Sequence, residues 1–589
     1  MSLAIDIWLQ RCNNSACNLG LRPSLSIRQF LTGNGTGMDY DIVVVGAGFG
    51  GPVAAKRCAD AGLRTVMLER GERVGEKVIS GLTIPFYGFL FGPAFIRDGN
   101  PPIERPADGI INYIIYDMDS GDIVIDDSLR IPAPLSPVFA FGYNAYCLPF
   151  CQWLADRAVE AGAELRTATV AVDVIRENGA IRGVVTDSGE RIGARLVIDA
   201  EGCQGLLAVK AGVRKKYPPD TISLADIYDY EMSKEDVDRI FGHTLRFCWG
   251  WDEQRIAPPL GYGNGLMVWP YRESLHFMQD QCLSTGAGKT PAMRDFEEYH
   301  RNITEGLQWW RDEVMPRARL RARIWDTFEI YVGLDPELRD MPAHTDGMLL
   351  IGDAAGLEST ELCDGVPAAW FSAEIAAEVA IESVRSDNAS ASFLARYDER
   401  IRSHPIIQWS ITSTNRRDLR YAQAGHDRQM LEKLVHDGWG LGSFKRASTP
   451  LARMVLQSIS DDPRIVTSWL KMFMRYYQNW SQGRFEESRQ LSEQVRRTAS
   501  ERLLANCLGL LDLMLDRFRR PLGSIARALV PLCGVLNPAV ELLLPVIEPP
   551  YLFLVRISEP VAGRLGKRFA RFVERADPGI LENRLAEDE

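Results

Sequence analysis

The sequence predicts an α/β chain in which a parallel β-α-β unit is interleaved with an antiparallel sheet and followed by a helical region. Three observations support this prediction. An apolar strand enters a glycine-rich turn and a helix after residue 40, and short strands with prolines occupy about 100–140 and 215–335. Helical periodicity dominates the rest of the chain. The predicted parts are an N-terminal extension over 1–38, a core over 39–390 and a C-terminal helical domain over 391–589.

Composition narrows the class of protein before any motif is considered. Apolar residues make up 46% of the 589 residues and charged residues 25%, which is typical of a folded globular chain. The formal charge of −11 disfavours a nucleic-acid binder, because phosphate contacts need a basic face. The 11 cysteines contain no Cys-x-x-Cys pair, which disfavours a disulfide framework, a zinc ribbon and an iron–sulfur cluster. We assemble no metal site and predict a reducing compartment, the cytoplasm.

The extension over residues 1–38 differs in composition from the rest. Asp6 is its only acidic residue, and it ends in a Gly-, Thr- and Asn-rich run that is typical of a flexible segment. It lacks the basic start and long apolar run of a secretory signal. Met38 immediately precedes the first strand, which favours an upstream start codon assigned in error, with a transit peptide as the alternative.

A glycine-rich turn is the strongest local motif. Gly46, Gly48 and Gly51 lie between a β-branched strand and a helix. In that context the first glycine makes the tight turn, the second admits a pyrophosphate to the backbone, and the third lets helix and strand pack closely. Glu69 ends the next strand, where a carboxylate accepts the hydroxyls of an adenosine ribose, and Arg70 follows it. These five residues predict one dinucleotide site.

Four further segments follow in the order expected of one flavoprotein superfamily. They are the loop ending in Ser80-Gly81, the turn Ala200-Glu201-Gly202, the turn Gly352-Asp353-Ala354-Ala355-Gly356, and the helix opening at Gly365-Val366. With the first turn they resemble the geranylgeranyl reductases, the electron-transfer-flavoprotein:quinone oxidoreductases and their nitrogen-fixation relatives. That superfamily is related to the p-hydroxybenzoate-hydroxylase-type monooxygenases and the flavin-dependent halogenases.

The resemblance implies an FAD cofactor in a Rossmann-like domain that is interleaved with an antiparallel β-sheet substrate domain. It places Asp353 on the ribityl and pyrophosphate part of FAD, and Ser80 and Gly81 beside the isoalloxazine. The helix that opens at Gly365 would aim its positive end at the flavin N1/C2 edge and stabilise the reduced anion. The other cofactor-binding residues implied are Glu201, Gly202, Gly352 and Val366.

The sequence departs from the superfamily where the flavin's reactive face would lie. Cys147 stands where the family often has Arg, and residues 358–364 stand where it often has Pro before the last glycine-rich loop. There Cys363 and Asp364 are the candidate catalytic residues, as a thiol or carboxyl that protonates or holds the substrate. The alternative is a loop cysteine and a helix-capping aspartate.

The middle of the chain contains a predicted antiparallel pair over 266–270 and 274–278. The strand through Trp269 corresponds to the strand that lines the family's substrate cavity, with a plain core sheet as the alternative. His276, within the second strand, is interpreted as structural.

Residues 517–575 reverse the charge of the chain, with ten Arg and Lys against four Glu. Their middle part is apolar but broken by prolines, so it contains no clean transmembrane span. Apolar helices with basic flanks suit a peripheral membrane contact or an isoprenoid-tail channel. The alternative is a helical domain packed on the core or on a partner subunit.

The resemblance implies an FAD-dependent oxidoreductase that reduces or dehydrogenates a hydrophobic substrate, isoprenoid or quinone-like, by hydride or electron transfer. The alternatives are an aromatic monooxygenase that uses a C4a-hydroperoxyflavin and a non-catalytic, flavin-bearing membrane adaptor. No second dinucleotide fold is visible in the sequence, which leaves a ferredoxin, a flavoprotein or NAD(P)H as the electron donor. The expected location is the cytoplasm, with membrane association.

Overall fold

The computed structural model divides the chain into two units, Met1–Met38 and Asp39–Glu589. It describes residues 38–76, 81–131, 140–217, 222–250, 252, 265–282, 292–329, 341–357, 365–413, 427–481, 499–536, 538–540, 542–544 and 546–551. The predicted extension therefore lies outside the described residues, apart from Met38.

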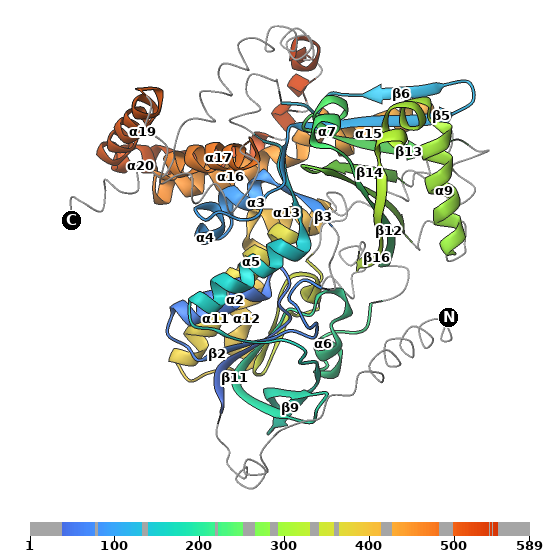
Figure 1. Ribbon diagram of the computed structural model, residues 1–589. Coiled ribbons are helices and arrows are strands. Elements are labelled where there is room, and N and C mark those ends of the chain that lie inside the picture. Colours follow the sequence, from blue (N-terminus) through green and yellow to red (C-terminus); the bar gives the residue numbers. More distant parts are fainter. Residues whose placement is uncertain are drawn as a thin grey trace. The chain divides into compact units, whose positions relative to one another are not determined.

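The first sheet carries the predicted β-α-β unit (Figure 1). Its central strand β1 (Tyr40–Val45) pairs in parallel with β2 (Thr65–Leu68) on one side and with β11 (Arg191–Asp199) on the other. In the described part of the chain its order is β17-β18-β11-β1-β2-β8, with β10 and β9 attached beyond β11. Those outer strands are β8 (Glu164–Arg166), β9 (Ala171–Glu177), β10 (Ala180–Thr186), β17 (His344–Thr345) and β18 (Met348–Leu350).

Three helices pack on this sheet. They are α2 (Gly51–Asp60), α5 (Cys147–Glu160) and α11 (Val366–Arg385), and α2 contacts both of the others. The alanines of α2 and α11 are largely buried, and they join the β-branched residues of β1 in one core. Cys147 and Cys151 of α5 are buried as well.

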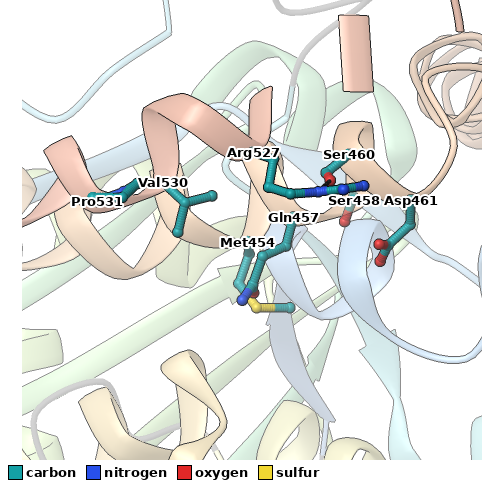
Figure 2. A pocket seen from close by; sticks show the side chains of 8 residues that line it. All are labelled: Met454, Gln457, Ser458, Ser460, Asp461, Arg527, Val530 and Pro531. Carbon is teal, nitrogen blue, oxygen red and sulfur yellow. Dashed lines mark hydrogen bonds between the residues drawn. The ribbon is translucent and has the colours of Figure 1, made fainter. Parts of the chain in front are cut away.

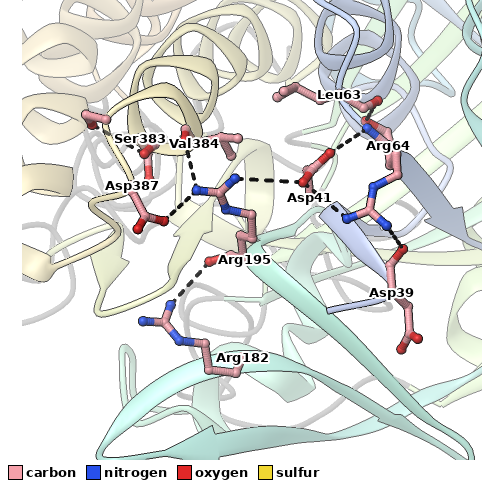
Figure 3. Close-up of polar contacts among 11 residues, drawn as sticks. Asp39, Asp41, Leu63, Arg64, Arg182, Arg195, Ser383, Val384 and Asp387 are labelled. Atoms are coloured by element: carbon pink, nitrogen blue, oxygen red, sulfur yellow. Dashed lines mark hydrogen bonds and ion pairs between the residues drawn. The ribbon is translucent and has the colours of Figure 1, made fainter. Parts of the chain in front are cut away.

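Ion pairs and hydrogen bonds connect neighbouring strands at the end of the first sheet where β1 begins (Figure 3). Asp41 accepts the backbone N–H of Arg64 at 2.9 Å and lies 4.0 Å from the guanidinium of Arg195. Arg195 also donates to the carbonyl of Val384, at the end of α11, at 3.0 Å. These contacts tie three strands and a helix together at the end of the sheet opposite the glycine turn, so that end has a structural role.

The second sheet has the order β16-β12-β15-β14-β13-β5-β6 among the described residues. The predicted pair is confirmed: β14 (Gly265–Pro270) and β15 (Ser274–Cys282) are antiparallel, with Trp269 opposite His276. Along β14, Leu266 and Val268 join the core beneath α9 (Met293–Gly306), whereas Met267 and Trp269 join the core beneath α15 (Arg428–Trp439). The sheet is thus covered on both faces. Its other strands are β5 (Gly109–Asp117), β6 (Asp122–Asp126), β12 (Ile222–Glu231), β13 (Thr244–Gly250) and β16 (Arg319–Glu329).

A small sheet of β3 (Gly81–Pro85), β7 (Gly142–Tyr146) and β4 (Arg105–Ala107) contacts both of these sheets. The remaining short elements are α3 (Phe86–Phe91), α4 (Ala94–Arg97), η3 (Gly202–Gln204), α6 (Leu206–Lys210), α7 (Lys234–Ile240), η5 (Trp310–Val314), η6 (Met315–Arg317) and η8 (Gly352–Ala355). The predicted α/β fold class with a helical C-terminal region is confirmed.

The C-terminal helices begin within the core of the first sheet. Trp469 of α17 donates to the carbonyl of Leu90 at 3.0 Å, and Tyr476 donates to that of Ile96 at 2.7 Å. The chain then continues into helices that lie farther from that core. The described helices of this region are α12 (Ala391–Ser403), α13 (Pro405–Ser413), η9 (Leu441–Ser443), α16 (Phe444–Asp461), α17 (Ile465–Ser481), α19 (Ala499–Arg517), α20 (Arg519–Leu529) and η10 (Val530–Val535).

Candidate functional site

The three glycines of the first turn have three different steric environments. Gly46 adopts φ 102°, and a Cβ atom there would lie 2.4 Å from the carbonyl oxygen of Ala200. A Cβ on Gly51 would lie 1.9 Å from the carbonyl oxygen of Gly46. Around Gly48, by contrast, no described heavy atom lies within 4 Å of that position. The structure therefore has a tight turn, an open approach to the backbone and a close helix–strand contact in the order that pyrophosphate binding requires.

The carboxylate of Glu69 is fixed beside this turn. Oε2 accepts the N–H of Ala47 at 3.0 Å, Oε1 accepts that of Gly71 at 2.9 Å, and the residue is buried. The N-terminus of α2 carries no acidic residue in its first turn, and the Gly50 cap makes no side-chain hydrogen bond. An external anion can therefore use the positive end of the helix, while Glu69 is oriented for a neutral, hydroxyl-bearing group.

Arg214 joins the two turns that the sequence predicts to bind FAD. It donates to the carbonyls of Asp353 and Ala354 in η8 at 3.3 and 3.1 Å, and to that of Cys203 in η3 at 3.1 Å. Tyr217 stacks on the guanidinium at 3.8 Å and donates its hydroxyl to the Asp353 carbonyl at 2.9 Å. This clamp sets the distance between η3 and η8.

A buried carboxylate, Asp199, and a partly buried one, Glu201, lie at the start of η3. Asp199, at the end of β11, accepts the N–H of Glu201 at 2.9 Å, and Glu201 accepts the N–H of Leu207 at 2.8 Å. Burial raises the pKa of Asp199 to about 6. Burial and then the charge of Asp199 raise the pKa of Glu201 to about 7. The second oxygen of Asp199 is buried without a hydrogen-bond partner among the described residues. The pair therefore holds a proton close to neutral pH.

The start of α11 meets both glycine turns. A Cβ on Gly50 would lie 3.3 Å from the Ala369 carbonyl, and one on Gly352 would lie 3.2 Å from the Ala369 side chain. Ser372 fixes this contact by accepting the N–H of Gly352 at 3.0 Å. The first turn of α11 carries no acid, and the Gly365 cap makes no side-chain bond. The helix end therefore remains positive, as a flavin anion requires.

The structure brings most of the predicted cofactor residues into this cradle, and it leaves three predictions untested. Arg70 belongs to the cradle, since it donates to Gln204 of η3 at 3.0 Å. The residues brought together are Gly46, Gly48, Gly51, Glu69, Arg70, Glu201, Gly202, Gly352, Asp353, Gly365 and Val366. Ser80, Cys363 and Asp364 lie outside the described residues.

Gly81 contacts the second sheet, and its place beside the isoalloxazine stays a prediction. Its N–H donates to Nδ1 of His276 at 3.1 Å, and a Cβ there would lie 2.0 Å from the Tyr271 hydroxyl. The sequence analysis missed Asp199, Arg214 and Tyr217, and it interpreted His276 as structural only. The sequence contains a signal for Asp199, because a charged residue stands there at the end of an apolar strand. For Arg214 it contains none, because the partners of Arg214 in η8 are distant in sequence.

Comparison with known proteins agrees with this geometry. The sequence profile of the FAD dependent oxidoreductase family matches residues 41–241. Digeranylgeranylglycerophospholipid reductase 1 of Methanopyrus kandleri is 28% identical over 372 residues, which cover 62% of this chain and 86% of that protein. Protein FixC of Salmonella typhi is 26% identical over 391 residues, which cover 62% of this chain and 82% of that protein.

A solved structure of a geranylgeranyl bacteriochlorophyll reductase-like protein from Thermoplasma acidophilum shares the fold. Its TM-score is 0.52 at 20% identity, with 69% of this chain and 99% of that chain covered. The predicted resemblance is confirmed: the chain is an FAD-dependent oxidoreductase, and it is similar in sequence to digeranylgeranylglycerophospholipid reductases and to FixC. The cradle residues fit FAD, since the open backbone at Gly48, the oriented Glu69 and two uncapped helix ends match its ribose, pyrophosphate and flavin.

Proposed function

We propose that this protein reduces or dehydrogenates a lipophilic substrate with an isoprenoid-like chain. The observation that carries the proposal is the match over most of the length of reductases named for a digeranylgeranyl lipid. FAD supplies two-electron chemistry when it is bound. The chain binds its adenosine end at Glu69 and its pyrophosphate at Gly48, and the positive end of α11 favours negative charge on the reduced flavin.

The second sheet supports a lipophilic substrate. Trp269 and Met267 of β14 belong to an apolar layer with Phe247, Trp249 and Trp439, although most of this layer is filled by side chains. Near Gly81 the same sheet presents Tyr271 and His276 to β3.

Anaerobic stopped-flow spectroscopy tests the proposal. The FAD-loaded protein is reduced and mixed with a geranylgeranyl-chain lipid, a short-chain quinone or a saturated lipid as control. We expect the unsaturated lipid or the quinone to reoxidise the flavin and the saturated lipid to leave it reduced. Equal behaviour of all three acceptors contradicts the proposal. An oxygen-dependent intermediate before reoxidation would instead support the monooxygenase alternative.

The electron donor is assigned by the same method. Ferredoxin, a flavoprotein and NAD(P)H are the candidates, because the sequence shows no second dinucleotide fold. A biological donor should reduce the bound flavin faster than the protein turns over. If none of the three reduces it, the non-catalytic membrane adaptor becomes the better description.

We infer further that residues 517–575 make a peripheral contact with a membrane that contains anionic lipid. Within the described part, Gly523 and Ala526 of α20 face α16, whereas Ile525 is 57% exposed and Leu529 41%. Further exposed apolar residues lie before and after α20 in the chain: Leu510, Leu513, Met514, Phe518, Leu532, Val535, Leu542, Leu543, Val546 and Ile547. Helix α20 thus turns its apolar face away from the protein, which is the orientation that an interfacial helix needs.

Basic side chains flank this apolar face. Arg517, Arg519, Arg520 and Arg527 lie on or beside α20. Arg527 lines a pocket of about 440 Å³ between α16 and η10, where its Nε donates to the Ser460 hydroxyl at 3.2 Å (Figure 2). Arginines at the border of an apolar face attract anionic head groups, which favours a bilayer over a neutral partner surface.

No single helix in the described part of the chain is long and apolar enough to span a bilayer. Only the bent pair Arg519–Val535 and Pro538–Leu544, with 60° between its helices, meets the length and composition criteria jointly. We propose a contact at the membrane surface.

Vesicle flotation tests this contact. We expect the protein to float with vesicles that contain anionic lipid and to do so more weakly with purely zwitterionic ones. Replacing Ile525 and Leu532 by Ser should abolish flotation. Leu320→Ser, at a residue that is 49% exposed on β16, is the matched control and should leave flotation unchanged. Flotation of the double variant at the wild-type level would refute the contact.

A further inference from the structure

One arginine of the second sheet is buried without a counter-charge. Arg246 of β13 is 9% exposed, and its Nε and Nη1 atoms have no hydrogen-bond partner among the described residues. The described part of the chain offers its guanidinium no ion pair either. Burial lowers the pKa of Arg246 from its ordinary value, but a guanidinium still keeps its charge at neutral pH. The side chain therefore carries a buried positive charge with unused hydrogen-bond donors.

Arg105 of β4 is a buried arginine of the opposite kind. It has no exposed surface, and it donates to the carbonyls of Tyr271 and Gly242 at 2.9 and 2.7 Å. Its guanidinium also lies 2.7 Å from the carboxylate of Asp238. A buried charge with such partners holds segments together, whereas a buried charge that lacks them destabilises the fold. A structural role therefore accounts for Arg105 and does not account for Arg246.

Aromatic rings surround the guanidinium of Arg246. Its central carbon lies 6.0 Å from the ring centroid of Phe241, and Phe241 meets Trp309 edge-on at 5.6 Å. Tyr113 of β5 stacks on Trp309 at 6.2 Å, and both of these side chains are only partly buried. Burial raises the pKa of Tyr113, and the positive charge of Arg246 acts in the opposite direction, so the phenol lies within electrostatic range of the guanidinium. The cation thus lies among rings that remain partly accessible.

The other charges near Arg246 do not neutralise it by direct contact. Arg130 adds a second positive charge, and Asp108 adds a negative one. The carboxylate of Asp108 accepts the hydroxyl of Thr244 at 2.7 Å and lies beyond ion-pair distance of Arg246. An anion from outside the chain can therefore still find a positive site here.

This site lies on the face of the second sheet that α9 covers. Arg246 pairs with Val268 of β14, which belongs to the core beneath α9. Trp269 and Tyr271 belong to the core on the other face, which contacts Gly81. Residues paired directly across two strands point to the same face, so Arg246 points away from β3. The site is therefore separate from the cofactor cradle and from the face proposed for the lipophilic substrate.

We propose that Arg246 binds the oxyanion of a small organic molecule with an aromatic body, either a carboxylate or a phosphate monoester. A guanidinium presents parallel N–H donors in the geometry that both of these groups accept. The rings of Phe241 and Trp309 offer a surface on which a flat apolar body can pack. Such a ligand gives the buried cation the partner that the described part of the chain does not supply. The proposal does not depend on the proposed function.

Isothermal titration calorimetry of the full-length protein tests this site, with FAD bound so that the cradle is closed to other anions. Sodium benzoate and phenyl phosphate are the probes, and benzyl alcohol is the uncharged analogue. At constant ionic strength, we expect at least one of the two anions to bind saturably and benzyl alcohol not to bind. The tighter of the two identifies the preferred head group. Arg246→Met should weaken that binding at least about tenfold, the equivalent of one hydrogen bond to a charged group.

Urea unfolding without added anion tests the buried charge itself. Arg246→Met removes a charge without a described partner, so the unfolding midpoint should stay the same or rise. Arg105→Met is the matched control, and it should lower the midpoint because it leaves Asp238 and two carbonyls without their donor. A fall in the midpoint of Arg246→Met as large as that of Arg105→Met, or failure of Arg246→Met to fold, overturns the proposal. Binding of neither anion, or equal binding to wild type and Arg246→Met, also overturns it.

Discussion

Two helices of this protein approach their neighbours through glycine, but they differ in what surrounds the contact. A Cβ on Gly51 of α2 would lie 1.9 Å from a backbone oxygen of the glycine turn, and one on Gly523 of α20 would lie 2.9 Å from the Ser460 carbonyl. Beside Gly51, the apolar Val53 is fully buried. Beside Gly523, Ile525 is 57% exposed.

The difference shows which surface each helix leaves for a partner. The core takes up the apolar face of α2, so only the backbone donors at its N-terminus remain for a ligand, and that ligand must be an anion. The buried face of α20 is built from small residues, and its large apolar residues remain outside. The cofactor cradle is therefore expected to bind its ligand through backbone donors in a fixed arrangement. Helix α20 is expected to bind its partner through exposed apolar side chains flanked by arginines.

The largest expected effect is at the clamp of the cradle. Arg214→Met leaves the η3 and η8 carbonyls without their donor, and it removes the cation near Asp199 and Glu201. We therefore expect the free energy of unfolding to fall by roughly 3–5 kcal/mol. Chemical denaturation at saturating FAD measures it. Arg70→Met removes one exposed bond to Gln204 and should cost less than about 1 kcal/mol. Similar losses for both variants would mean that Arg214 is not a clamp.

The glycines of α2 and its turn give the next effect. Gly51→Ala forces a methyl group against backbone and should cost about 3 kcal/mol of unfolding free energy. Gly48→Ala meets no described atom and should change stability by less than about 0.5 kcal/mol. It should nevertheless weaken FAD binding at least about tenfold, because its methyl occupies the pyrophosphate's approach. Fluorescence titration with FAD separates the two effects, and unimpaired FAD binding by Gly48→Ala would contradict the assigned cradle.

The buried acid pair predicts a pH dependence of intermediate size. The pKa values of Asp199 and Glu201 in the folded state, about 6 and about 7, lie above those of the unfolded chain. Their contribution is therefore fully present below about pH 4 and is lost as the pH rises through 6 to 7. In Asp199→Asn, the free energy of unfolding should change between about pH 5 and 8 by roughly 2 kcal/mol less than it does in the wild type. Urea unfolding across this range measures it, and parallel curves for variant and wild type would refute the assignment.

The smallest effect is expected on the outer face of α20. Ile525→Ser should change the unfolding free energy by less than about 0.5 kcal/mol, since the side chain contacts little of the protein. Its neighbour Ala526 is 3% exposed, and Ala526→Leu should cost about 1–3 kcal/mol. Equal destabilisation by both variants, read from thermal unfolding, would show that the apolar face of α20 is covered in the native protein.

The parts of the site that could be predicted are those with a local cause. Gly46, Gly48 and Gly51 are recognisable because a strand, a turn and a helix need them within a few residues of one another. Arg214 and His276 could not be predicted, because their roles depend on the η8 carbonyls and on the Gly81 amide, which lie more than 100 positions away in the sequence.

The C-terminal region divides in the same way. Its helical character and basic, apolar composition are properties of the chain and were predictable. The outward direction of Ile525 and Leu529 was not predictable, because hydrophobic periodicity identifies an apolar face without saying whether it meets a core or the solvent.

The sequence by itself determined the α/β class, the FAD cofactor and the adenosine end of the cradle, since short-range sterics and helix-end charge act between residues close in the chain. Tertiary structure decided how η3 and η8 are clamped, where burial raises the pKa of Asp199 and Glu201, and which sheet contacts Gly81. These features arise where strands distant in sequence come together and exclude water. Burial there gives an ordinary arginine, aspartate or histidine fixed partners.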